Sequence, residues 1–144
     1  MSRATPKMRD FAKRLIAYEA RGNKSFETKK TPAAFHVCEK LRVHLSTFMG
    51  NAGFRALLAR SLALASAEVA WLRAMHVKAD GSLEGLDELE AQVDPNEIAE
   101  GCVVLLAQLL GLLVAFIGED LTLRLVREVW PQLSLNNLDI VGIR

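Results

Sequence analysis

Residues 94–117 decide the fold and read DPNEIAEGCVVLLAQLLGLLVAFI. Asp94 is a favourable helix N-cap, and Pro95 suits the first helical turn because its missing N–H leaves no partner unsatisfied there. Glu97, three residues after the cap, completes the pattern of a capping box. The sequence therefore predicts a helix that begins at Pro95 and continues to Gly118, where it breaks or kinks.

The second part of this stretch, residues 102–117, contains one polar residue, Gln108. At 1.5 Å per residue it spans roughly 24 Å, which is shorter than the ~30 Å hydrocarbon core of a bilayer. Acidic residues flank it and neither Lys nor Arg does, so the usual anchors of a membrane span are missing. We expect the central helix of a bundle rather than a membrane-inserting segment. Gln108 then needs a hydrogen-bond partner, either within the chain or across a dimer axis.

The composition fits this expectation. Leu and Ala contribute 42 of the 144 residues, whereas Val and Ile, which buried sheets prefer, contribute 16. With 51% apolar residues and a net charge of +1, the chain is neither disordered nor a nucleic-acid coat that relies on bulk positive charge. We predict an all-α, single-domain bundle of about five helices around the central hydrophobic helix 95–117, with no nucleic-acid partner.

Helix start and stop residues divide residues 1–144 further. A basic N-terminal helix within 1–22 begins with Thr5 as cap, Pro6 at its first position and Gly22 as its stop. Its apolar stripe is expected at Met8, Phe11, Leu15 and Tyr18.

A linker (23–31) leads into a helical core (32–130). Within it we predict a helix from Pro32 to Gly50, one from about Ala52 to Met75, the central helix, and one from Glu119 to Trp130. The apolar stripe of the first of these is expected at Phe35, Cys38, Leu41, Leu45 and Phe48. A long acidic loop (76–93) contains a hairpin-like turn at Asp80-Gly81 and a helical turn over 86–92. The C-terminal arm (131–144) completes the chain.

Small residues recur at helical spacing on the two longest predicted helices, and such ridges let helix axes approach closely. We predict that the ridges face each other, with close helix packing at Ala63, Ala67, Ala107, Gly111 and Ala115. The first ridge also includes Ala59, Ala70 and Ala74. Leu58, Leu62, Val69 and Leu72 would then contact the first two helices.

Charge is unevenly distributed along the chain. Residues 1–44 carry a net charge of +7, whereas residues 77–120 carry −9. Opposite charges of this size favour docking of one segment onto the other, within a chain or between chains. The exposed basic face of the first helix is expected to consist of Lys7, Arg9, Lys13 and Arg14.

No catalytic signature stands out. His36, Cys38 and His44 point in different directions on a helix, so we expect no metal site, and no Gly-rich phosphate loop or nucleophile elbow occurs. We therefore expect no enzyme and no cofactor. Cys38 and Cys102 are expected to be buried thiols in a cytoplasmic chain, because the N-terminus does not read as a secretion signal.

The surplus of apolar residues predicts association. The first hypothesis is a non-enzymatic interaction module, an adaptor or scaffold that forms a homodimer or binds a protein partner. Its contact residues are expected to be Leu121, Leu125, Trp130, Leu138, Ile140 and Ile143. The alternatives are a membrane-active protein that releases its central hydrophobic hairpin, and a helical enzyme or small-ligand carrier with an internal pocket between the third, fourth and fifth helices.

Overall fold

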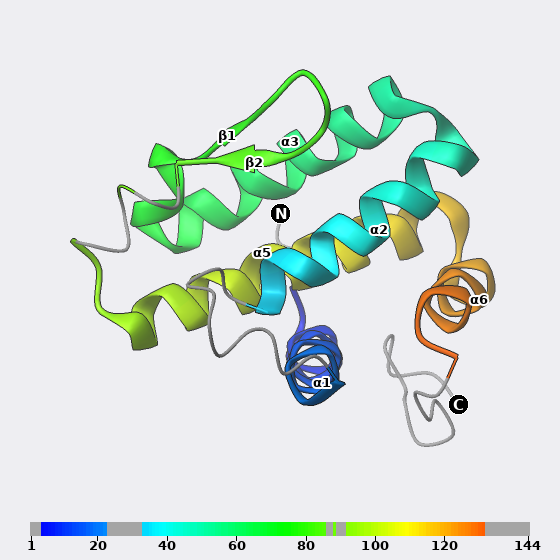
Figure 1. The fold of residues 1–144 in the computed structure, drawn as a ribbon, viewed down its shortest axis with the longest axis horizontal. Helices are drawn as coiled ribbons and strands as arrows, with labels where there is room; N and C mark the ends of the chain where they lie inside the picture. Colours follow the sequence, from blue (N-terminus) through cyan, green and yellow to red (C-terminus); the bar gives the residue numbers. More distant parts are fainter. Residues whose placement is uncertain (1–3, 23–32, 86–87, 89–91, 132–144) are drawn as a thin grey trace.

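The structure, a computed structural model, describes residues 4–22, 33–85, 88 and 92–131. It confirms the all-α architecture, to which a two-stranded hairpin is added (Figure 1). The elements in chain order are α1 (Pro6–Gly22), α2 (Ala33–Met49), α3 (Asn51–Glu68), the short 3-10 helix η2 (Ala70–Ala74), β1 (His76–Val77), β2 (Leu83–Glu84), α5 (Pro95–Ile117) and α6 (Glu119–Val129).

Helix α5 forms the centre of the fold, as predicted. It packs against α1, α2, α3 and α6, and in Figure 1 it runs through the middle of the molecule with α2 crossing it. α3 and α5 run antiparallel, so the start of α3 lies beside the end of α5. Leu105, Leu106, Leu109 and Leu110 are almost completely buried. The helix is long and apolar enough to cross a membrane, yet most of its apolar window is enclosed by the chain itself.

Gln108 is fully buried within this core. The hypothesis that its amide pairs with a second copy across a dimer axis is therefore wrong, because its own chain encloses the side chain on every side.

Two of the predicted N-cap residues cap the N-termini of their helices, α1 and α5. The hydroxyl of Thr5 accepts a hydrogen bond from the Met8 N–H at 3.2 Å, and the Asp94 carboxylate accepts one from the Asn96 N–H at 2.8 Å. Helices α5 and α6 are separated by Gly118, whose φ of 91° is a conformation that favours glycine. The predicted cap of α2, at Thr31 and Pro32, lies outside the described residues.

Helix α3 ends earlier than the predicted residue 75. Val69 is extended, with φ −120° and ψ 105°, and the chain continues as η2. This change of direction allows Trp71 to lie against α5, where its indole N–H donates to the Glu97 carbonyl at 3.1 Å. Gly101 makes the approach possible, since a Cβ there would lie 2.5 Å from Cζ2 of Trp71.

The prediction that two small-residue ridges face each other is wrong. Ala63 and Ala67 are exposed, as are the other ridge positions of α3 and η2, namely Ala59, Ala70 and Ala74. On α5, Ala107 and Gly111 are buried but Ala115 is exposed.

The opposite face of α3 is buried instead, at Phe54, Leu58, Ser61, Leu62 and Ala65. Burying Leu or Phe removes far more apolar surface from water than burying Ala, which explains the choice of face. Leu58 shares a core cluster with residues of α1 and α2, as predicted, whereas Leu62 and Leu72 belong to a second cluster formed mainly with α5 residues such as Cys102 and Leu105.

On α2, Val37, Cys38, Leu41 and Leu45 form the buried stripe. Phe48, which was predicted to belong to it, has 49% of its surface exposed because it lies in the last turn, where α2 leads into Gly50. The side chain of Phe35 lies outside the described residues.

The acidic connection contains the predicted hairpin. β1 and β2 pair antiparallel, with Val77 opposite Leu83. Asp80 closes the turn, because its carboxylate accepts a hydrogen bond from the Ser82 N–H at 2.9 Å, and Gly81 has a φ of 89°. Most of the predicted helical turn over 86–92, and the arm beyond Pro131, lie outside the described residues.

Candidate functional site

An apolar groove lies between α3 and the end of α5. It has a volume of about 580 Å³ and is open to solvent. Its lining consists of Met49 from α2, Gly53, Ala56, Leu57, Arg60 and Leu64 from α3, and Leu112, Ala115 and Phe116 from α5. The site is suited to apolar surface, because Arg60 is the one charged residue among these nine.

Two small residues of α3 create the hollow. Gly53 and Ala56 lie one helical turn apart, so both contribute to the same wall. A Cβ added to Gly53 would lie 3.3 Å from Cγ of Met49, so even a methyl group would narrow this end of the groove.

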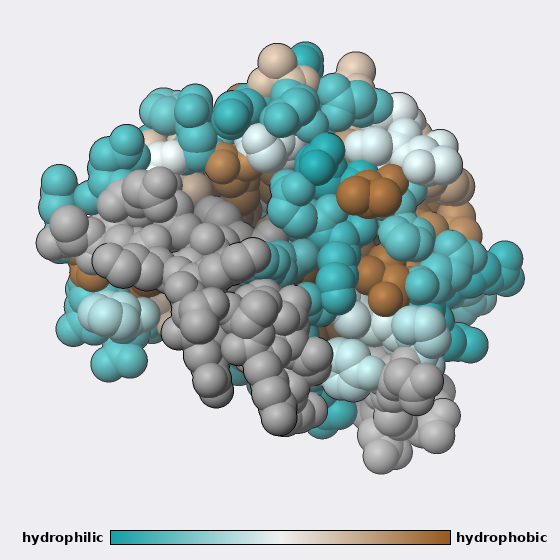
Figure 2. Space-filling view, in the orientation of Figure 1, coloured by the Kyte–Doolittle hydropathy of each residue, from teal (hydrophilic) through white to brown (hydrophobic). Residues whose placement is uncertain are grey.

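Phe116 is the most exposed large apolar side chain of the described residues, with 71% of its surface open to solvent. It lies at the end of α5, two residues before the Gly118 break, so α6 turns away and leaves it uncovered. Large exposed apolar groups grouped around a hollow are a common property of binding surfaces. By contrast, the face over α2 and the hairpin is mostly hydrophilic, with small separate apolar patches (Figure 2).

The predicted contact residues do not form this site. Leu125 and Trp130 are buried, at 7% and 2% exposure, and belong to the core of the chain. The prediction that they form an interface is therefore wrong, because α6 turns its apolar face inward onto the bundle. Leu121 is half-buried. Leu138, Ile140 and Ile143 lie outside the described residues.

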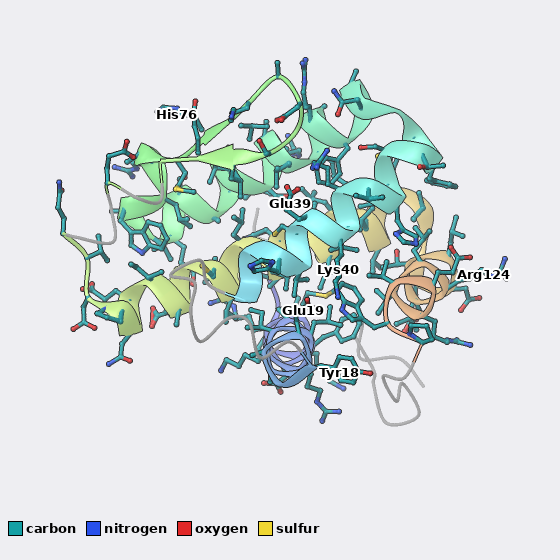
Figure 3. All side chains as sticks on the ribbon, viewed as in Figure 1. Tyr18, Glu19, Glu39, Lys40, His76 and Arg124 are labelled. Atoms are coloured by element: carbon teal, nitrogen blue, oxygen red, sulfur yellow. The ribbon has the colours of Figure 1, made fainter. Side chains whose placement is uncertain are left out.

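A buried carboxylate explains the position of Trp130. Oε1 of Glu19 accepts hydrogen bonds from the Trp130 indole N–H at 2.9 Å and from Nζ of Lys40 at 2.8 Å. Its Oε2 is buried and has no hydrogen-bond partner among the residues that the structure describes. Figure 3 shows Glu19 and Lys40 between α1 and α2. Sequence reasoning missed this cluster, which ties the end of α6 to α1 and α2.

The predicted basic face of α1 is exposed at Lys7, Lys13 and Arg14. Arg9 instead forms a bidentate ion pair with Glu68 of α3, with both N–O distances at 2.6 Å. These hydrogen bonds raise the pKa of Arg9 and lower the pKa of Glu68. This pair docks α1 onto α3, but Glu68 lies outside the acidic segment 77–120, so the pair is not the predicted docking of the basic segment onto the acidic one.

The two cysteines are free, buried thiols, as predicted. Desolvation raises the pKa of each to about 12, so neither is a reactive thiolate at neutral pH. Within the described residues, no group of three or more His, Cys, Asp or Glu side chains is arranged to hold a metal ion.

The groove differs from the internal pocket that was expected of a ligand carrier between the third, fourth and fifth helices. The groove is open to the surface rather than enclosed, and α6 contributes nothing to its lining. A smaller hollow of about 220 Å³ lies between α2 and the hairpin loop, beside Cys38 and Gly81.

No family model, curated protein or solved structure matches the chain.

Proposed function

We propose that this chain is a non-enzymatic interaction module whose α3–α5 groove binds an amphipathic helix of a protein partner. The observation that carries the proposal is the exposure of Phe116, at 71%, on the rim of an apolar groove of about 580 Å³. A helix that places apolar side chains in such a groove uses a common mode of protein recognition.

The shape of the groove favours a helix over a small molecule. Its two walls are antiparallel helices, and Gly53 and Ala56 leave room for side chains of a third helix to enter between them. Phe116 and Leu57 supply apolar contact on opposite walls. Apolar anchors in desolvated pockets contribute most of the affinity in typical protein interfaces.

Arg60 indicates the charge of the partner. It is exposed and lines the groove, and no hydrogen bond or ion pair engages it in the part of the chain that the structure describes. A carboxylate at the edge of the bound helix would pair with this guanidinium. The preferred ligand is therefore an amphipathic helix with an apolar stripe and an acidic residue beside it.

A displayed library of helix-forming peptides tests the proposal. The immobilised chain should enrich peptides with apolar residues at i, i+3 or i+4, and i+7, accompanied by Asp or Glu. Ala56→Glu places a charge inside the groove and should abolish binding of the enriched peptides. Ala59→Glu is the matched control, because Ala59 is also exposed on α3 but does not line the groove. Failure to enrich any such peptide, or equal loss with both variants, would contradict the proposal.

One observation favours a second candidate function. α5 is apolar enough to insert into a membrane, and its last turn is already exposed at Ala115 and Phe116. In this alternative the basic face of α1 attracts anionic lipid and α5 is released. Flotation with anionic liposomes separates the two candidates. An interaction module stays in the soluble fraction, whereas a membrane-active chain rises with the vesicles and Phe116→Glu reduces the bound fraction.

A further inference from the structure

The two ends of the groove are lined by different kinds of side chain. At one end lie Met49, Gly53 and Phe116, because the start of α3 lies beside the end of α5. Arg60 and Leu64 follow about two and three turns further along α3 and line the groove toward its other end. A ligand that fills the groove therefore meets different chemistry at each end.

The end at Met49 is apolar and adaptable. Met49 lies against the α3 backbone where Gly53 has no side chain, since a Cβ on Gly53 would meet Cγ, Cβ and Sδ of Met49 at 3.3, 3.5 and 3.6 Å. The mostly exposed ring of Phe116 lines the same end. A thioether and an aromatic ring both make favourable contacts with another aromatic ring, and the unbranched methionine side chain adapts to its shape.

The spacing of residues along α3 sets the spacing on the ligand. Gly53 and Arg60 are seven residues apart, which places them on the same face of α3 and roughly 10 Å from each other along its axis. Leu57 lies between them, and Leu112 lines the opposite wall. A bound helix that follows the groove in either direction spans this distance with about seven or eight residues.

We infer that the groove selects helices with an aromatic anchor at the Met49 end and a carboxylate about seven or eight positions away, which pairs with Arg60. This inference rests on the proposed function, since it specifies the ligand of the same groove. The aromatic anchor contacts Met49 and Phe116, and an aliphatic residue between anchor and carboxylate contacts Leu57 and Leu112. Met49 is therefore the residue that determines the specificity for the anchor.

The peptides enriched from the displayed library test the spacing. Phe or Trp should be over-represented at one apolar position, with Asp or Glu about seven or eight positions away in either direction. Selection on the Arg60→Glu variant should replace the acidic residue by Lys or Arg at the same spacing and retain the aromatic anchor. Enrichment of acidic residues at unrelated spacings, or of aliphatic anchors in place of aromatic ones, overturns the inference.

A single enriched peptide and its counterpart with Leu at the anchor position test the role of Met49. Fluorescence anisotropy measures the dissociation constants of both peptides. The wild-type chain should bind the aromatic anchor about tenfold more tightly than Leu. Met49→Leu keeps the size of the side chain but removes the sulfur, so it should weaken the aromatic-anchored peptide about threefold and leave the Leu-anchored peptide unchanged. Equal changes for the two peptides contradict the assigned role, and they are also what a folding defect would produce.

A larger side chain in the α3 wall tests the size of the anchor. Ala56→Leu fills the groove one turn from Gly53, and Leu is a good helix former, so α3 should fold normally. The aromatic-anchored peptide should bind about tenfold more weakly, whereas a peptide with Ala at the anchor position should bind at least as tightly as it binds the wild-type chain. Ala59→Leu is the matched control outside the groove and should change neither affinity. Equal loss of both peptides with Ala56→Leu overturns the inference.

The outcomes separate this inference from the proposed function. If amphipathic peptides bind the groove and Ala56→Glu abolishes their binding, but neither an aromatic anchor nor the spacing is selected, the proposed function stands and the inference is wrong. If no peptide is enriched, the proposed function fails and the inference fails with it.

Discussion

The middle and the end of α5 have similar apolar sequences but different surroundings. Nearly every residue from Gly101 to Leu113 is buried, beneath α1, α3 and the ring of Trp71. Three residues later, Phe116 is 71% exposed. The helix itself is continuous, since α5 extends to Ile117 without a break.

This contrast shows that neighbouring elements, not the apolar sequence, decide what is covered. Trp71 reaches the first part of α5 because Gly101 has no side chain and the chain leaves the α-helical path at Val69. At the other end Gly118 turns α6 away. Residues of the covered part are therefore expected to stabilise the fold, and residues of the uncovered end are expected to bind a partner.

Thiol reactivity should show the largest difference between the middle of α5 and its end. In a Cys38→Ala background, Cys102 is buried and should react with a thiol reagent only when the chain opens. Opening of a covered segment costs up to the full free energy of unfolding, so protection of about 1,000-fold or more is expected. An Ala115→Cys substitution places a thiol at the exposed end, where it should react nearly as fast as a free thiol. Absorbance measures the reaction rates of the thiols at positions 102 and 115. Fast reaction of Cys102 would contradict its burial.

Truncation of an apolar side chain should lower the free energy of unfolding far more in the middle of α5 than at its end. Leu106→Ala removes a fully buried side chain and should lower the free energy of unfolding by about 2–5 kcal/mol. Phe116→Ala, although it deletes a larger group, should change it by less than about 0.5 kcal/mol, because the ring is mostly solvated. Denaturant unfolding measures both. Equal losses would show that the end of α5 is covered.

A double-mutant cycle tests the contact between Gly101 and Trp71, because loss of the ring should relieve the clash that a larger residue at 101 creates. Gly101→Ala forces the new methyl group against the indole and should destabilise the fold by about 1–3 kcal/mol, despite the better helix propensity of Ala. Trp71→Ala removes the clash, so the double variant should be more stable than the sum of the single changes predicts. Additive effects in this double-mutant cycle would mean that the ring does not lie against Gly101.

The ion pair that docks α1 onto α3 should have the smallest effect. Because Arg9 lowers the pKa of Glu68 below its usual value of 4.5, the pair stabilises the fold above that value. This contribution is lost as the pH falls through the lowered pKa. Both side chains are partly exposed, so Glu68→Gln should cost only about 0.5 kcal/mol at pH 7 and nothing once Glu68 is protonated. Unfolding of both proteins at neutral and acidic pH measures the difference, and a larger loss in acid would contradict this pairing.

Features that depend on local chemistry could be predicted from the sequence. The boundaries of α5 follow from Asp94, Pro95 and Gly118, which act through their own backbone and nearest neighbours. The central place of α5 follows from its composition, since an all-apolar helix must be surrounded in water. The hairpin at Asp80-Gly81 was predicted for the same local reasons.

Features that depend on contacts with residues far away in the sequence could not be predicted from the sequence. The break at Val69 exists because Trp71 meets Gly101, thirty residues further along the chain. α3 has apolar residues on two faces, so its own sequence does not decide between the alanine ridge and the leucine face. The groove was not predicted for the same reason. Small residues such as Gly53 and Ala56 are compatible both with close helix packing and with an open groove. Phe116, just before a helix-ending glycine, was the available signal.

The hydrogen bond between Glu19 and Trp130 joins residues that are 111 positions apart. During synthesis at about 5–20 residues per second, Glu19 is made about 6–20 s before the indole that it will bind. For that period its carboxylate can remain hydrated, and α1 lacks both the central helix and the contact that holds the end of α6. Helix α1 is thus among the last elements of the bundle to be fastened, and the bundle closes only after Trp130 has been translated.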